Sequence, residues 1–372
     1  MVIKSGSPLN RIPVEVWLLI AEKLSVRDLQ VMGATDKHVR SIIMPLLRGC
    51  KLLQMITREP ESSSVEFLIK SEYVDIRVKD AHHMTALHYA AMKNYKRLIR
   101  FLTTNSQHKT LLNAPENRRG DTPLIIAVRC QNEEVMRLLL DAGADANVLN
   151  AHGESVLFWT IKRQQPNLAR MLLNRGADPN QIVRHGLTLL ILAIMSGCLG
   201  SVAALLEQGC DVEQPDGQGH RPLAWAVVSD DIATARLLIS YNTKISVYSS
   251  GDREERSPLV WAVMMGNVDM VRLLLSQGAD TEHTQLDRRA PLIWAVIHRD
   301  KSVAEVLLQS GARPNETDGN GQTALAWAIL NSDKEMVELL LEYGADAEGI
   351  RRNEWLAAFV PGVERERTVL TH

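Results

Sequence analysis

One hexapeptide with a fixed arrangement of polar and apolar positions recurs along most of the chain. It usually opens with Thr or Ser, and its third residue is Leu in all eight copies. The copies start 37, 33, 33, 33, 36, 33 and 33 residues apart. They read TALHYA at 85–90, TPLIIA at 122–127, SVLFWT at 155–160, TLLILA at 188–193, RPLAWA at 221–226, SPLVWA at 257–262, APLIWA at 290–295 and TALAWA at 323–328. This period predicts a solenoid of stacked units rather than one globular core.

A second apolar segment follows most of the hexapeptides and ends in glycine at a constant phase. In the copy that lacks this glycine, Asn242 takes its place. Asn is the usual substitute for Gly where a helix ends in a left-handed residue. The glycines of this series are Gly143, Gly176, Gly209, Gly278, Gly311 and Gly344. We therefore expect a left-handed residue after the second helix of each unit.

Each unit carries the signals of two short helices. Thr or Ser at the start of the hexapeptide suits an N-cap, and Pro beside it suits the first helical position. Leu124 should face inward with Ala127 and Val128, because residues three and four apart share one helical face. In a later unit, 266–267 (Gly-Asn) turns the chain and a second amphipathic helix is expected over 268–276.

These motifs resemble the signature of the ankyrin-repeat family over roughly 80–349, and the TPLxWA form is similar to repeats common in fungal ankyrin proteins. The resemblance implies an all-α solenoid of helix–turn–helix units with β-hairpin-like fingers. We expect eight repeats at 80–349, a degenerate capping repeat at 49–79, and a C-terminal cap helix and tail at 350–372. The two long spacings predict insertions within 103–117 and 245–256, on the finger side.

The first 48 residues do not follow the repeat. Residues 1–11 are expected to be a flexible N-terminus, and 12–48 a small domain of three short helices. This segment resembles the F-box, in which Met32 stands where Leu is usual and Ile12 replaces the usual Leu. The residues that fall at the places of the F-box pattern are Ile12, Pro13, Glu15, Val16, Ile20, Leu24, Asp28 and Leu29.

The F-box resemblance implies a function and a first set of site residues. F-box chains bind a Skp-type adaptor and through it a cullin-based ubiquitin ligase, so this chain would be the substrate-recognition subunit and its ankyrin arm would bind an unidentified target protein. The alternative is a non-enzymatic ankyrin scaffold or inhibitor in which residues 12–47 only cap the solenoid. The candidate adaptor-binding residues are Ile12, Pro13, Val16, Leu24 and Leu29.

Aromatic residues recur at the fifth hexapeptide position, two residues after the core Leu and about 200° round the helix from it. They are Tyr89, Trp159, Trp225, Trp261, Trp294 and Trp327. One interpretation is an aromatic ladder that lines a concave groove, since Trp is enriched at binding hot spots. The other, which the recurrence within the repeat favours, is contact between the first helices of successive repeats. The two roles are compatible.

The eighth and ninth residues, counted from the start of each hexapeptide, should face the groove. They run Arg129-Cys130, Lys162-Arg163, Met195-Ser196, Val228-Ser229, Met264-Met265, Ile297-His298 and Leu330-Asn331. The groove would therefore begin basic and become apolar, as in a protein-binding surface; variation on a solvated face is the alternative. The candidate groove residues are Arg129, Lys162, Arg163, Met195, Trp225, Trp261, Met264, Met265, Trp294, His298 and Trp327.

Composition narrows the functional classes. The net charge of −2 and the lack of a long apolar run give no support to nucleic-acid binding or membrane insertion. The four cysteines are widely spaced, which fits a reducing, cytoplasmic or nuclear location. His82 and His83 lack a third ligand at suitable spacing, and His88 is expected to be structural. With no catalytic or phosphate-binding motif, we expect no enzyme activity, no cofactor and no bound metal, and a monomer outside the ligase complex.

Overall fold

The computed structural model describes residues 77–104, 109–116, 118–183, 186–246, 256–282 and 289–347. The chain divides into two compact units, Met1–Asp178 (unit 1) and Pro179–His372 (unit 2). Residues 12–48, most of the expected repeat at 49–79, residues 350–372 and most of the expected insertion at 245–256 lie outside the described residues. The adaptor candidates Ile12, Pro13, Val16, Leu24 and Leu29 lie there too.

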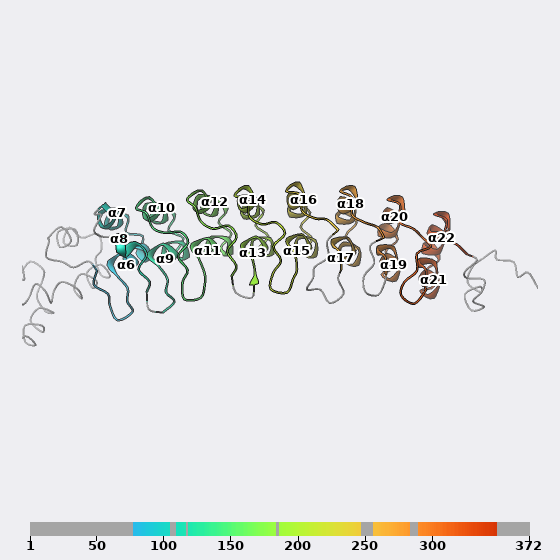
Figure 1. The fold of residues 1–372 in the computed structure, drawn as a ribbon, viewed down its shortest axis with the longest axis horizontal. Helices are drawn as coiled ribbons and strands as arrows, with labels where there is room; N and C mark the ends of the chain where they lie inside the picture. The colour runs from blue at the N-terminus through green and yellow to red at the C-terminus, as the bar shows by residue number, and fades with distance from the viewer. Residues whose placement is uncertain are drawn as a thin grey trace, which may run out of the picture. The chain divides into compact units, whose positions relative to one another are not determined.

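Unit 1 is built from pairs of antiparallel helices. In Figure 1 its first helices α6, α9 and α11 lie in one row and its second helices α7, α10 and α12 lie in another. Neighbouring first helices pack directly against each other, α6 on α9 and α9 on α11. The bounds are α6 Ala86–Lys93, α7 Lys96–Thr104, α8 Lys109–Leu112, α9 Pro123–Arg129, α10 Glu133–Asp141, α11 Val156–Lys162 and α12 Pro166–Asn174.

Unit 2 repeats the same helix pair. Its first helices α13, α15, α17, α19 and α21 form one row, and each packs against the next. The second helix α18 covers the residues expected for it from the sequence. The bounds are α13 Leu189–Met195, α14 Leu199–Glu207, α15 Pro222–Val228, α16 Ile232–Ser240, α17 Pro258–Met264, α18 Val268–Ser276, α19 Pro291–Ile297, α20 Lys301–Gln309, α21 Ala324–Leu330 and α22 Lys334–Glu342.

The helix ends follow the expected chemistry. The hydroxyl of Ser155 accepts a hydrogen bond from the backbone N–H of Phe158 at 3.1 Å, and Thr188 caps α13 in the same way. Beyond the second helices, the glycine series adopts positive φ, and Asn242 adopts φ 60° in the same role. The sequence prediction of a left-handed residue at each of these positions is confirmed. The structure adds a second left-handed position between the two helices of each repeat, occupied by Asn94, Gln131, Gln164, Gly197, Asp230, Gly266, Arg299 and Ser332.

The core of each unit lies between its rows of helices. The hexapeptide leucines are at most 2% exposed, and Ala127 and Val128 are buried beside Leu124 as expected. Small residues at these positions allow neighbouring first helices to approach closely. Each leucine fills a site whose truncation to Ala would cost about 2–5 kcal/mol.

The fingers between repeats are held by side chains rather than by strands. In three described fingers, an Asp accepts backbone N–H groups two and four residues later, as Asp216 does from Gln218 and His220, both at 2.9 Å. Within the described residues only isolated antiparallel bridges occur, Ile182 with Thr188 and Thr317 with Thr323. The expected hairpin-like fingers are therefore turns closed by Asx hydrogen bonds, and the described fold is all-helical.

A ladder of polar side chains joins each repeat to the next within each unit. In each bond the acceptor is a side chain just before a finger. The donor is a backbone N–H of the next repeat, two residues after the left-handed residue that ends its second helix. In unit 2, Asn180 accepts from Asp211 at 2.8 Å and Asn315 accepts from Asp346 at 2.7 Å, in each case across 31 residues. Each such bond fixes the spacing between neighbouring repeats.

The first predicted insertion contributes to the core. The described part of 103–117 contains the short helix α8, whose Leu111 and Leu112 are each 4% exposed. The insertion therefore adds buried apolar surface to unit 1 as well as length to the loop after α7.

Candidate protein-binding surface

The final residue of each first helix differs systematically between the two units. In unit 1 the helices α6, α9 and α11 end in Lys93, Arg129 and Lys162, and Arg163 follows α11. Lys93, Lys162 and Arg163 are exposed, and Arg129 is half-buried. We call these four residues the basic face. Because α6, α9 and α11 pack side by side, their charged ends lie on one surface of unit 1.

In unit 2 the same position is apolar. Met195, Val228 and Leu330 are 49%, 40% and 47% exposed, whereas Met264 and Ile297 are half-buried. Met265, one residue later, is 54% exposed. The apolar row of unit 2 consists of Met195, Val228, Met264, Met265, Ile297 and Leu330. Since each first helix packs against the next, exposed apolar side chains recur along one surface of the unit.

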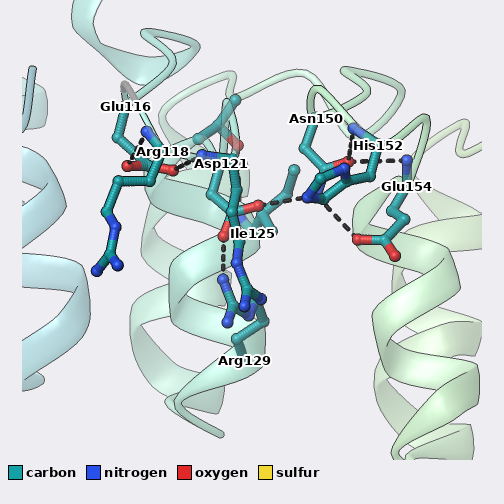
Figure 2. Close-up of polar contacts among 10 residues, drawn as sticks. Glu116, Arg118, Asp121, Ile125, Arg129, Asn150, His152 and Glu154 are labelled. Carbon is teal, nitrogen blue, oxygen red and sulfur yellow. Dashed lines mark hydrogen bonds and ion pairs between the residues drawn. The ribbon is translucent and has the colours of Figure 1, made fainter. Parts of the chain in front are cut away.

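A buried carboxylate organises the neighbourhood of Arg129. Asp121 is 1% exposed; its Oδ2 pairs with the Arg129 guanidinium, and its Oδ1 accepts from Asn150 Nδ2 at 2.9 Å (Figure 2). The same amide group of Asn150 donates to Glu154 at 3.0 Å. A buried charge is tolerated when it is paired and hydrogen-bonded. Arg129 therefore compensates a buried charge in addition to contributing to the basic face.

The ring of Trp159 contacts two cations of the basic face, Arg129 and Lys162. The Arg129 guanidinium carbon lies 4.9 Å from its ring centre and the Lys162 Nζ lies 5.0 Å from it. Lys162 Nζ also lies 5.4 Å from the Phe158 ring, which meets Trp159 edge-on at 5.5 Å. The negative faces of aromatic rings attract cations. This attraction holds the charged groups of Arg129 and Lys162 beside the rings.

The tryptophans of unit 2 link first helices to fingers. Nε1 of Trp225 donates to Oδ2 of Asp216 at 3.0 Å, and Trp327 makes the same bond to Asp318 at 3.1 Å. In unit 1, Tyr89 donates its hydroxyl hydrogen to the equivalent Asp80 at 2.6 Å. The aspartate that closes each of these fingers thus also anchors the aromatic ring of the following helix.

Arginines of the fingers stack on the remaining tryptophans. The Arg256 guanidinium lies 4.7 Å from the Trp261 ring centre. Arg289 lies 5.2 Å from Trp294 and 5.6 Å from Trp327, so it spans two neighbouring repeats. The four tryptophans of unit 2 are half-buried, whereas Trp159 is 9% exposed. Those of unit 2 are Trp225, Trp261, Trp294 and Trp327. The rings therefore pack between helix and finger, and those in unit 2 remain partly accessible.

His298 has a different environment from the other groove candidates. It follows α19, is exposed, and stacks on Trp294 with ring centres 5.9 Å apart. Together with Trp294 it gives the apolar row an aromatic border in unit 2.

Two titratable groups near the finger of Asp121 have shifted pKa values. Burial lowers the pKa of His88 to about 4, although the backbone of Asp121 and Ala114 acts in the opposite direction. His88 is fully buried, and its Nδ1 accepts from the backbone N–H of Thr85 at 3.1 Å. Burial raises the pKa of Glu116, but N–H donors from the finger outweigh burial and lower it. His88 is therefore neutral at pH 7 and bonded within its repeat, consistent with a structural role.

The candidates chosen from the sequence did not cover the surface fully. The sequence pattern misses Lys93, and it places Val228, Ile297 and Leu330 at groove positions but not among the candidate binding residues. Phase alone finds Val228, Ile297 and Leu330, because each is the last residue of a seven-residue first helix, whereas Lys93 lies one place later in its repeat, at the end of the eight-residue α6. The Asp–Trp bonds had no such signal, since their partners lie nine residues apart.

The described residues contain no group of three or more His, Cys, Asp or Glu side chains placed to hold a metal ion. None of the described helices has both the length and the apolar character needed to cross a bilayer. The features that stand out are therefore the two surfaces at the ends of the first helices.

The ankyrin-repeat family model, described as "Ankyrin repeats (3 copies)", matches the sequence in overlapping segments: 52–150, 107–183, 157–249, 190–285, 246–318 and 277–351. The chain therefore belongs to the ankyrin-repeat family. Ankyrin repeats indicate a protein–protein interaction module, and the fold is typically a non-enzymatic binding scaffold.

A solved structure agrees with this assignment. The ankyrin repeat domain of Bcl-3, described as a unique member of the IkappaB protein family, is 26% identical with a TM-score of 0.55, and the match covers 60% of this chain and 99% of that one. The human ASB11 ankyrin repeat domain is also 26% identical, with a TM-score of 0.49 over 61% of this chain and 99% of that one. A comparison with curated proteins found no match.

Proposed function

We propose that this chain is the substrate-recognition subunit of a Skp–cullin–F-box ubiquitin ligase and that the apolar row of unit 2 binds the target protein. The observation that carries target binding is the exposure of Met195, Met265 and Leu330, each about half accessible at the end of a first helix. Burying such side chains against a partner is favourable by about 25 cal/mol per Å² of apolar surface. Met also adapts its shape to varied partners.

The composition of the first helices supports this surface as a binding site. In unit 2 the five first helices carry no charged residue. A solvated helix end normally carries polar or charged side chains, so their absence here needs another cause. Depletion of charge with enrichment of Trp and Met is characteristic of the cores of protein interfaces.

The ligase role rests on the N-terminal sequence. Pro13, Leu24 and Leu29 occupy places of the F-box pattern, which joins a chain to a Skp-type adaptor. In this arrangement the chain performs no chemistry. Its contribution is geometric, because it brings a lysine of the target near a conjugating enzyme held elsewhere in the complex.

The target site is tested by matched charge insertions. Met265→Glu and Leu330→Glu place carboxylates in the apolar row, whereas Leu199→Glu places one on a second helix at a residue that is 41% exposed. Affinity capture followed by quantitative mass spectrometry should find proteins retained by wild type and Leu199→Glu but lost from the other two. Equal capture by all three variants would refute the assignment of the target site.

The adaptor is tested separately with purified Skp-type protein. Pro13→Asp and Leu24→Asp should abolish its binding to the full chain while the target still binds. If the wild-type chain does not bind the adaptor, the ligase role is wrong and the chain is a scaffold or inhibitor in which residues 12–47 act as a cap.

A further inference from the structure

The first helices of unit 1 end in positive charge and carry no compensating carboxylate. No Asp or Glu occurs in these three helices or in the turns that directly follow them. The segments are 86–95, 123–132 and 156–165. Asp121, which directly precedes the N-cap of α9, is buried and already paired with Arg129. The exposed charge of the surface is therefore of one sign.

The carboxylates of the second helices in unit 1 are engaged elsewhere. Glu134 on α10 pairs with Lys96 and Arg100 of α7, and Asp141 pairs with Arg175 at 2.7 Å. Each of these pairs joins residues on or just after second helices. Within the described part of unit 1, Lys93, Lys162 and Arg163 make no side-chain hydrogen bond or ion pair.

Helix electrostatics alone does not account for these cations. A cation in the last turn of a helix interacts favourably with the helix dipole. However, the five first helices of unit 2 have the same length as α9 and α11, and none carries a basic residue in its last turn. The repeat therefore forms without this charge, and the basic face of unit 1 needs a separate explanation.

We infer that the basic face of unit 1 binds an acidic segment, rich in Glu or Asp, of the target protein. This inference rests on the proposed role of the chain as a target-binding adaptor, and it names the chemistry that unit 1 recognises. Lys162 lies over the rings of Phe158 and Trp159, so its charge is positioned before the partner arrives. Carboxylates provide the complementary charge for its ammonium group and for the Arg163 guanidinium.

A protein segment fits this surface better than a nucleic acid does. The basic face comprises four residues, and the chain as a whole has a net charge of −2. Nucleic-acid sites commonly show a broad basic stripe and a strongly positive domain.

The test uses the full-length protein and a defined probe. A fluorescein-labelled peptide of alternating Glu and Ser is titrated with the chain and followed by anisotropy, beside a Gln-Ser peptide and an oligothymidylate of equal length. Lys162→Gln with Arg163→Gln removes two charges from the basic face. The matched control, Arg137→Gln with Arg175→Gln, removes two charges from the second-helix side of the same unit.

The Glu-Ser peptide should bind more tightly than the Gln-Ser peptide, with an affinity that falls as salt is raised. The Lys162/Arg163 double variant should lose about tenfold in affinity, as expected for removal of two exposed charges, while the control pair changes little. Thermal melting of both variants checks that they are folded.

Three results would overturn the inference. These are failure of the Glu-Ser peptide to bind, an equal loss in both double variants, and preferential binding of the oligothymidylate. None of them bears on adaptor binding or on the effect of Met265→Glu, so the proposed function is judged independently.

Discussion

The indole Nε1 of Trp327 donates a hydrogen bond to Oδ2 of Asp318, nine residues earlier and 3.1 Å away. The other oxygen of the same carboxylate accepts the backbone N–H groups of Asn320 and Gln322, both at 2.9 Å. Asp318 is only 4% exposed. One side chain therefore closes the finger and attaches it to the helix that follows.

Asp318→Ala should lower the free energy of unfolding by about 2–3 kcal/mol, since it removes these hydrogen bonds and leaves buried donors unpaired. Trp327→Phe removes the indole N–H together with part of the aromatic surface but keeps one ring, and loss of the hydrogen bond should cost about 1 kcal/mol. Urea unfolding followed by circular dichroism measures both. An Asp318→Ala protein as stable as Trp327→Phe would show that the carboxylate does not hold the finger.

Gly186 and Gly278 separate close packing from backbone conformation. Both have positive φ, at 71° and 86°. A Cβ on Gly186 would lie 2.5 Å from the Cα of Gly217, whereas a Cβ on Gly278 would meet nothing within 4 Å. Gly278→Ala should therefore cost about 1–2 kcal/mol, the penalty for a left-handed L-residue.

Gly186→Ala should cost more than Gly278→Ala, because backbone of the next finger must also move. The urea midpoints of the two variants, measured in parallel, test this order. Equal midpoints would mean that the fingers of unit 2 adjust without loss.

Asn242 ends α16 in the left-handed conformation that Gly supplies elsewhere, with φ 60°. Asn242→Gly should leave stability unchanged or raise it slightly, because Gly adopts this conformation without steric cost. Asn242→Val should lower the free energy of unfolding by about 1–2 kcal/mol, as a β-branched residue resists positive φ. Thermal unfolding of both variants gives the comparison, and a Val variant as stable as the Gly variant would contradict it.

His88 should make stability depend on pH in a defined window. Its pKa falls from 6.5 to about 4 on folding, so the unfolded chain binds the proton more tightly. Above pH 6.5 His88 is neutral in both states and the free energy of unfolding has its full value. As the pH falls toward 4, the unfolded chain takes up the proton, and the free energy of unfolding falls by up to about 3 kcal/mol.

The His88→Gln variant provides the comparison for this effect. The difference in free energy of unfolding between wild type and His88→Gln isolates the His88 titration, since groups such as Glu116 titrate in both proteins. Urea unfolding at several pH values between 4 and 7 measures it. A difference that stays constant with pH would show that folding does not lower the pKa of His88.

The sequence predicted the helices well because the determinants of each helix are local. A Thr or Ser cap, the core Leu and a left-handed terminal residue lie within one repeat, so spacing alone locates α18 at Val268–Ser276. The same spacing predicts that Asn242 adopts the left-handed conformation, although the residue is not Gly.

The binding surface was harder to predict because exposure depends on neighbouring repeats. Met264 and Met265 are adjacent in sequence, yet the first is half-buried and the second is 54% exposed. Likewise, nothing in the sequence distinguishes Arg129, paired to a buried carboxylate, from Lys162, which has no such partner among the described residues. For Arg129, a contact between its helix and the preceding finger makes the difference.

Apart from Arg129, the last residue of each first helix contributes little to caps or core, and the same scaffold accepts Lys, Arg, Met, Val, Ile or Leu at this place. Selection can therefore exchange these residues one at a time without endangering the fold. A lineage that carries such repeats can acquire new clients by point substitution, and an engineer can randomise the same positions as a ready-made library.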